Sequence, residues 1–200
     1  EIAPIRAVAQ EQAAAPAAAP AEQAPEPLTA EETEILVARI APYPDELVAV
    51  ITAASLYPLQ IVEAQRYLDQ YAKNKELKPK SDWDGSVVSL LNYPEIVKMM
   101  SDDLDWTQMM GEAITLQQKD VLVAIQQLRE KAVAEGIIKT DDKVVVVQQQ
   151  DAIVIQPAQP EVIYVPQYEP AMLFDPYYAV APITYYPTAY PHYWDPVAPF

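Results

Sequence analysis

Proline is distributed unevenly along the chain, and its positions limit where helices and strands can form. Five of the 20 prolines lie in residues 1–28 and ten lie in residues 157–200, whereas none lies between Glu95 and Gln156. Proline lacks a backbone N–H and has a fixed φ, so it interrupts helices and central strands. The sequence therefore predicts one packed part between two proline-rich segments.

Residues 1–28 are almost entirely Ala, Pro, Gln and Glu, with little apolar surface to bury. This composition is typical of a semi-rigid linker, because proline favours extended polyproline geometry. The chain begins with Glu1 and not with Met, from which we expect either a processed protein whose targeting segment has been removed or a sequence that has been trimmed. A linker at this position suits a tether to a membrane anchor upstream.

Residues 29–142 show the 3.6-residue periodicity of helices. Thr29 and Glu32 form a capping-box pattern, and the first helix is expected to run to about Ala41. The pair Tyr-Pro then recurs, and Pro44, Pro58 and Pro94 are each predicted to be the first residue of a helix. The preceding tyrosine is excluded from helical geometry and is expected to pack over the new helix.

Further helix starts are predicted from aspartates that can cap free N–H groups. Helices are expected after Asp84, Asp103 and Asp120, and Gly136 is placed to end the last of them. In that last helix an apolar stripe is expected from Val121, Leu122, Ile125 and Leu128. The sequence therefore predicts six or seven short helices in a compact, irregular array.

The period changes to that of strands in residues 143–166. The runs KVVVVQQ, AIVIQ and EVIYV predict a β-hairpin or a three-stranded meander with a turn at Gln150 and Asp151. Four consecutive valines at an open sheet edge would invite aggregation, so we expect the strand to be covered. The fold class predicted is α+β, mainly α, and the chain is expected to end in an extended Tyr/Pro-rich arm, residues 167–200.

Tyrosine is concentrated near this C-terminal arm. Eight of the 13 tyrosines lie between Tyr164 and Tyr193, and they alternate with prolines that keep the chain extended. Tyrosine suits interfaces because it is large and rigid and has a polar end. We therefore expect the arm to lie beyond the core and to bind a partner. The partner-binding residues predicted are Tyr164, Tyr168, Tyr177, Tyr178, Tyr185, Tyr186, Tyr190, Tyr193 and Trp194.

The residues that commonly carry chemistry are scarce. The chain has no cysteine, and its one histidine, His192, lies in the arm. Two acidic clusters, Asp82 with Asp84 and Asp102 with Asp103 and Asp105, could bind calcium or act as paired carboxylates. Both lie where helix caps are predicted, and capping is the favoured interpretation. We predict no catalytic residue, no metal site and no cofactor.

Several long runs of sequence resemble a bacterial family known as domain of unknown function 3300. The runs are IAPYPDELVAVITAASLYPLQIVEAQRYL, WDGSVVSLLNYPEIVKMMSDDLDWTQMMGEA, DVLVAIQQLREKA and IVIQPAQPEVIYVPQYEP, which lie within about Glu34 to Pro170. The resemblance implies a protein exported to the periplasm or outer surface of a Gram-negative bacterium, with a signal peptide or lipid anchor upstream. It implies no activity.

The formal net charge of −16 argues against nucleic acid as a partner, because a phosphate backbone would be repelled. The leading hypothesis is a non-catalytic envelope protein that docks onto a larger protein assembly through its arms, with homo-oligomers left open. One alternative is a glycan or peptidoglycan binder that uses exposed tyrosines. Another is a hydrolase that uses the acidic clusters.

Overall fold

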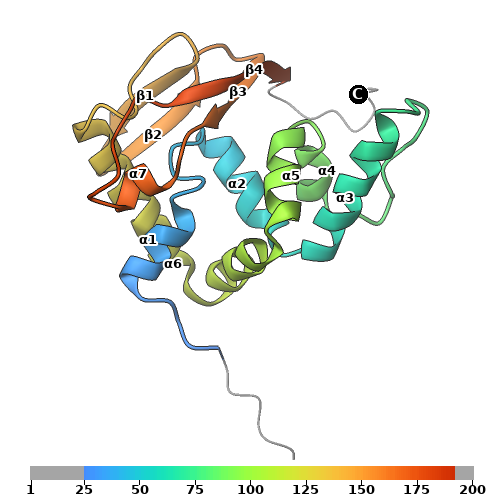
Figure 1. The fold of residues 1–200 in the computed structure, drawn as a ribbon, viewed down its shortest axis with the longest axis horizontal. Coiled ribbons are helices and arrows are strands. Elements are labelled where there is room, and N and C mark those ends of the chain that lie inside the picture. The colour runs from blue at the N-terminus through green and yellow to red at the C-terminus, as the bar shows by residue number, and fades with distance from the viewer. Residues whose placement is uncertain (1–24, 192–200) are drawn as a thin grey trace, which may run out of the picture.

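A computed structural model of the protein describes residues 25–191 (Figure 1). The helices are α1 (Ala30–Val37), α2 (Asp45–Ala54), α3 (Pro58–Tyr71), α4 (Gly85–Leu90), α5 (Pro94–Asp102), α6 (Leu104–Ala134) and α7 (Ala171–Phe174). The strands are β1 (Val144–Gln149), β2 (Ala152–Pro157), β3 (Val162–Gln167) and β4 (Thr184–Pro191). The fold class is α+β, mainly α, as the sequence predicts.

The helices pack mainly in pairs, and two small antiparallel sheets cover one end of the array (Figure 1). Helix α1 packs on α6, α3 packs on α5, and α2 packs on α4. One continuous core joins the helical and β parts, from Leu36 in α1 to Leu173 in α7. Within residues 25–191 no single helix is long and apolar enough to span a membrane, and only the bent pair α2 and α3, 110° apart, has the length and composition for it.

Local signals place most helix starts correctly. The capping box of Thr29 and Glu32 is formed, and it lowers the pKa of the Glu32 carboxyl through hydrogen bonds from Thr29. Helix α1 ends at Val37, however, and not near Ala41, and a series of turns follows it. The residue before a proline avoids helical geometry, so Pro42 and Pro44 favour this early end.

Each Tyr-Pro pair lies at the start of a helix, but in one pair the proline precedes the first helical residue. Pro58 and Pro94 lie in the first turns of α3 and α5, whereas Pro44 is the N-cap of α2. The expected packing of the tyrosine holds for Tyr43 and Tyr93, which are buried, but Tyr57 is 37% exposed. Burial raises the pKa of the Tyr93 hydroxyl to about 12.

Changing Tyr93 to Ala is expected to lower the free energy of unfolding by about 3 kcal/mol, as for other truncations of large buried aromatics. Changing Tyr57 to Ala is the matched control, because its ring is 37% exposed, against 5% for Tyr93, while its position before a proline is the same. We expect the control to lower the free energy of unfolding by less than about 1 kcal/mol. Urea denaturation measures both, and equal losses would show that ring burial is not the cause.

Helix α6 is interrupted earlier than the sequence predicts. The backbone leaves helical geometry at Gln117 (φ −147°, ψ 45°), whereas the sequence places a new start after Asp120. The side-chain amide of Gln117 accepts from the Leu28 N–H at 2.7 Å and donates to the Leu28 carbonyl at 3.1 Å. A partner 89 residues away thus stabilises the kink, which no local pattern reveals.

The second half of α6 buries a slightly different stripe from the one expected. Val121, Ile125 and Leu128 are buried, but Leu122 is 53% exposed. Gly136 ends the helix region with a φ of +71°, as its capping role requires. Gly111 allows close helix packing, because a Cβ there would lie 2.5 Å from the carbonyl oxygen of Ser55.

The first two strands form the predicted hairpin, but the third strand does not extend it into a meander. β1 pairs with β2, whereas β3 pairs with β4, which comes from the C-terminal arm. The expectation that the arm lies beyond the core is therefore wrong for four of its tyrosines. These residues pack against the core: Tyr168, Tyr185, Tyr186 and Tyr190. Pro187 is tolerated because it lies at the irregular part of the β3–β4 pairing, where it has no ladder partner.

The two outer edges of the β1–β2 hairpin are bonded within the chain. On β1, Val144 exchanges hydrogen bonds with Asp141, and Val146 exchanges them with the Thr140 hydroxyl. On β2, the backbone of Ile153 exchanges hydrogen bonds with the Gln126 amide. The run of valines, in which Val144 is buried and Val147 is 37% exposed, is thereby prevented from pairing freely along this part of its edge.

Candidate functional site

The two acidic clusters act mainly at helix ends. Asp84 caps α4 and Asp103 caps α6, as predicted. Hydrogen bonds from Ser86 lower the pKa of the Asp84 carboxyl. The backbone N–H of Trp106, and then the guanidinium of Arg39, lower the pKa of the Asp103 carboxyl.

The other members of the clusters lie apart from these caps. Asp102 pairs with Lys98 one helical turn earlier, and Asp82 and Asp105 are exposed. Among the side chains in residues 25–191, no group of three or more His, Cys, Asp or Glu could hold a metal ion. The carboxylates of the two clusters are therefore not gathered into a common site.

The predicted partner-binding residues are divided between the surface and the interior. Tyr177 is 96% exposed and Tyr178 is 44% exposed, and both follow α7. Tyr164 is half-buried beside Lys143, whereas Tyr168, Tyr185, Tyr186 and Tyr190 pack on the core. Tyr193, Trp194 and the histidine His192 lie outside the described residues. Only part of this set can thus present free aromatic surface.

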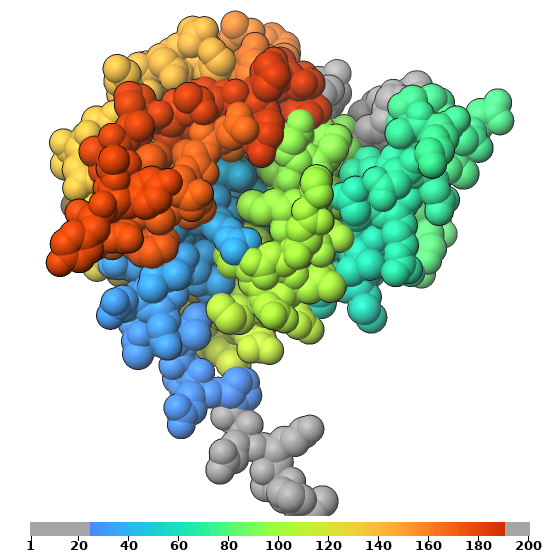
Figure 2. Space-filling view, in the orientation of Figure 1, coloured from blue at the N-terminus to red at the C-terminus, as the bar shows by residue number. Residues whose placement is uncertain are grey.

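A groove of about 540 Å³ lies between α1, the start of α6 and α7. Ile35 and Met109 stand at its surface with exposed fractions of 45% and 43%, and Trp106 is buried beneath them. In Figure 2, α1 in blue lies between the lime segment of α5 and α6 and the orange-red C-terminal segment. The remaining lining residues are Leu28, Glu32, Leu36, Arg39, Asp103, Asp105, Glu169, Pro170, Ala171 and Phe174.

Two aromatic side chains hold the walls of this groove in place. The Trp106 indole N–H donates to the Leu36 carbonyl at 2.9 Å, and the Tyr168 hydroxyl donates to the Ala38 carbonyl at 2.6 Å. Carbonyls at the end of a helix lack partners within the helix, so these bonds satisfy them. The end of α1 is consequently fixed to both α6 and the segment after β3.

A second cavity, of about 350 Å³, adjoins the groove and is called the tyrosine pocket below. Its aromatic walls are Tyr43, Tyr168 and Tyr186, and its carboxylates are Glu95 and Glu169. The other lining residues are Arg39, Met99, Val165, Pro166, Gln167 and Pro170. Because Arg39, Glu169 and Pro170 line both hollows, the groove and the pocket meet at these residues.

Arg39 at this junction is already engaged by its neighbours. Its guanidinium lies 2.6 Å from an Asp103 carboxylate oxygen and 5.4 Å from the centre of the Trp106 ring. Charge pairing and cation–π contact both hold the side chain over the groove wall. The positive charge of Arg39 is thus largely offset by Asp103.

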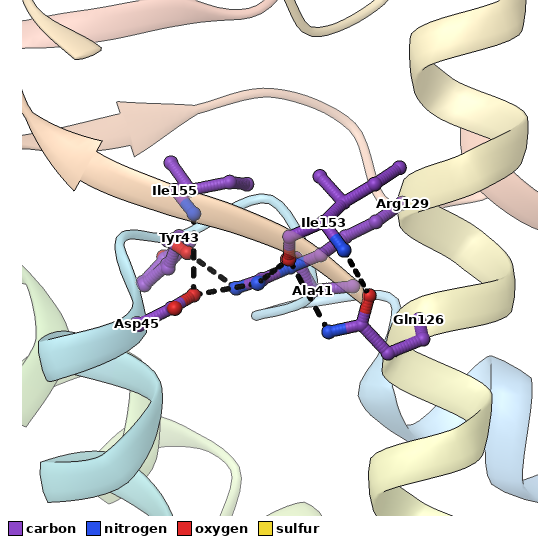
Figure 3. A network of polar contacts seen from close by, with 7 residues as sticks. All are labelled: Ala41, Tyr43, Asp45, Gln126, Arg129, Ile153 and Ile155. Atoms are coloured by element: carbon purple, nitrogen blue, oxygen red, sulfur yellow. Dashed lines mark hydrogen bonds and ion pairs between the residues drawn. The ribbon is translucent and has the colours of Figure 1, made fainter. Parts of the chain in front are cut away.

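Behind the tyrosine pocket, the buried side chain of Arg129 joins three parts of the chain (Figure 3). It donates to the carbonyls of Ala41 (2.7 Å), Tyr43 (3.0 Å) and Ile153 (2.8 Å). It also pairs with Asp45 at 2.5 Å. The network links α6, the α1–α2 connection and β2, and it sets the backbone position of Tyr43.

Sequence reasoning missed Arg39, Glu95, Glu169 and Arg129. For Arg129 a signal is present, because it follows Ile125 by four residues and precedes Ala132 by three, on the buried face of α6. A charged residue on such a face needs buried partners. Arg39, Glu95 and Glu169 give no comparable signal, since they meet only through the fold.

Comparison with known proteins identifies relatives but no activity. The family described as protein of unknown function (DUF3300) matches residues 29–199. The uncharacterized protein YacH of Escherichia coli (strain K12) is 30% identical in an alignment 175 residues long, which covers 69% of this chain and 28% of that protein. The chain thus spans little more than a quarter of that relative. No solved structure matches the chain.

Proposed function

Starting from the fact that the chain belongs to the family described as protein of unknown function (DUF3300), we propose that it is a non-catalytic interaction module of the cell envelope. Its task is to bind an extended segment of a partner protein in the groove between α1, α6 and α7. Localisation to the periplasm or outer surface is part of the proposal. The linker-like composition of residues 1–28 supports it.

The observation that carries the proposal is the apolar groove itself. Ile35 and Met109 remain largely exposed although they lie side by side with Leu28, Trp106 and Phe174 in one concave lining. Single exposed apolar residues are ordinary, but a continuous apolar concavity marks a binding surface. The lining runs from α1 across the start of α6 to α7, and we take its occupant to be an extended segment.

The charges around the groove favour a basic partner segment. Four carboxylates line it, namely Glu32, Asp103, Asp105 and Glu169, against the single guanidinium of Arg39. The whole chain carries a net charge of −16, so long-range attraction also favours a cationic partner. We therefore expect a segment that combines apolar side chains with Lys or Arg.

The C-terminal arm contributes a second contact in this proposal. Tyr177 and Tyr178 lie on the stretch between α7 and β4, next to the end of the groove that α7 forms. Their exposure leaves aromatic surface for a partner that continues past α7. The arm thus acts from a position fixed by β4, and not as a free tail.

Selection from a random peptide display library on the full chain tests this function. Enriched peptides are expected to contain apolar residues with Lys or Arg, and Met109→Gln is expected to weaken their binding at least tenfold. Leu59→Gln is the matched control, because Leu59 is 80% exposed but lies outside the groove. Enrichment that is equal for both variants, or selection of acidic peptides, would contradict the proposal.

The same preparation separates the alternative functions. Binding of peptidoglycan or another polysaccharide in a pull-down, undisturbed by Met109→Gln but lost on changing Tyr177 to Ala, would favour glycan recognition. Hydrolysis of a glycan that is lost in Asp103→Asn and retained in Tyr177→Ala would favour the carboxylate-dependent enzyme.

A further inference from the structure

The tyrosine pocket differs from the groove in its chemistry, although the two are joined. Its aromatic walls face a space that also holds the carboxylates of Glu95 and Glu169. Aromatic faces and carboxylates together favour a cationic group, since ring faces carry partial negative charge. An anionic or purely apolar occupant would leave both carboxylates without a countercharge.

The positive charge needed to balance these carboxylates is missing from the lining. Among the described residues that line the pocket, Arg39 is the one cation, and its guanidinium is paired with Asp103. Two carboxylates therefore face the pocket with little compensation. A ligand that brings its own positive charge would complete the site.

The pocket is built from side chains that are held before any ligand binds. Tyr43 and Tyr168 pack edge to face at 6.4 Å, and the Tyr168 hydroxyl is fixed to the Ala38 carbonyl. Both carboxylate oxygens of Glu95 lie 2.6 Å from the Tyr190 hydroxyl, which donates to them. A preformed site loses less side-chain entropy on binding.

The packing of the Tyr190 ring holds its hydroxyl in position to bond Glu95. Its ring packs edge to face on Tyr93 at 5.7 Å, so its hydroxyl has a defined direction. Burial, and then the Glu95 carboxylate, raise the pKa of the Tyr190 hydroxyl above its ordinary value. The hydroxyl therefore stays protonated at neutral pH and remains the donor to Glu95.

We propose that the tyrosine pocket binds the ammonium or guanidinium group of a Lys or Arg side chain in the partner segment. This inference rests on the proposed function, because the segment lies in the groove and reaches the pocket at Arg39, Glu169 and Pro170. The groove takes the apolar residues of the segment. The pocket takes its cationic residue and thereby sets the register of binding.

The test uses small probes in place of the partner. N-acetyl-lysine amide and its neutral analogue N-acetyl-norleucine amide are titrated into the full chain, and binding is followed by NMR shifts of Tyr186. We expect the lysine probe to bind in the millimolar range and the norleucine probe at least fivefold more weakly. Glu95→Gln and Glu169→Gln should each weaken the lysine probe about fivefold, as the loss of one partly exposed charge pair implies.

Two further variants test whether changes in binding are specific to the carboxylates of the pocket. Tyr190→Phe keeps the Glu95 carboxylate but removes the hydroxyl that holds it in place, so the lysine probe should bind more weakly than to the unaltered chain but more tightly than to Glu95→Gln. Leu59→Gln, outside both hollows, should leave the binding unchanged. Thermal unfolding of each variant verifies that it is folded.

The outcomes separate this inference from the proposed function. The proposal for the pocket is wrong if the two probes bind equally, or if neither Gln substitution changes the binding of the lysine probe. This holds even if groove-binding peptides are selected. If binding of the lysine probe depends on Glu95 and Glu169 but no selected peptide depends on Met109, the proposal for the pocket holds and the proposed function of the groove is wrong.

Discussion

Replacing Arg129 by methionine is expected to lower the free energy of unfolding by about 3 to 5 kcal/mol, the range for breaking a buried charged network. Methionine fills similar space but donates no hydrogen bond. The carbonyls of Ala41 and Tyr43 would lose this donor, and the Ile153 carbonyl would keep only the Gln126 amide (Figure 3). Asp45 would lose its ion-pair partner. A buried acceptor left without a partner is costly.

Urea denaturation, followed by tryptophan fluorescence, measures this loss. Arg66→Met is the matched control, because Arg66 is an exposed arginine in the middle of α3. We expect the control to change stability by about 0.5 kcal/mol or less. If Arg129→Met unfolded at the same urea concentration as the control, the network would not stabilise the junction.

Ending the chain after Asp175 is expected to lower the free energy of unfolding by about 5 kcal/mol or more, which is enough to unfold many domains of this size. The truncation deletes β4, and with it the strand partner of β3. It also removes Tyr185, Tyr186 and Tyr190, which pack against the core. Each is a large, partly buried aromatic, so their losses combine with those of the strand.

A chain that ends after Pro191 serves as the reference for this truncation, because it keeps every described contact. Circular dichroism and urea denaturation of the two chains measure the difference. Equal stability would show that the C-terminal arm is separate from the domain, as the proline and tyrosine pattern alone indicates. Unfolding of the shorter chain would show that the arm is part of the core.

The sequence predicts those parts of the fold that depend on near neighbours. Thr29, Asp84 and Asp103 cap helices through bonds to N–H groups two or three residues away. The turn at Gln150, with a φ of 53°, likewise lies directly between the paired strands. Patterns of a few residues are sufficient to identify such features.

Distant contacts explain what the sequence does not predict. The pairing of Ile163 with Tyr190 joins residues that lie on either side of α7 in the chain, and prolines in β4 argue against a strand there. The kink at Gln117 depends on Leu28 in the same way. Local propensity is overridden where tertiary contacts compensate for it.

The candidate site could not be predicted for the same reason. The two acidic clusters are conspicuous in sequence because their aspartates are adjacent, yet capping accounts for Asp84 and Asp103. The groove and the tyrosine pocket combine residues from α1, α5, α6, α7, β3 and β4 and from the connections after α1 and β3. Sequence composition indicated that tyrosines matter, but not that Tyr168 and Tyr186 line a cavity together with Glu95.

The double hydrogen bond between Leu28 and Gln117 has a mechanical consequence. Both bonds clamp the backbone of one residue at the point where the described chain begins to pack on the domain. Any pulling force transmitted along the residues before Leu28 would reach this clamp and the kink of α6 together with the cap of α1. The load would then enter the longest helix directly, so that the short helix α1 need not bear it alone.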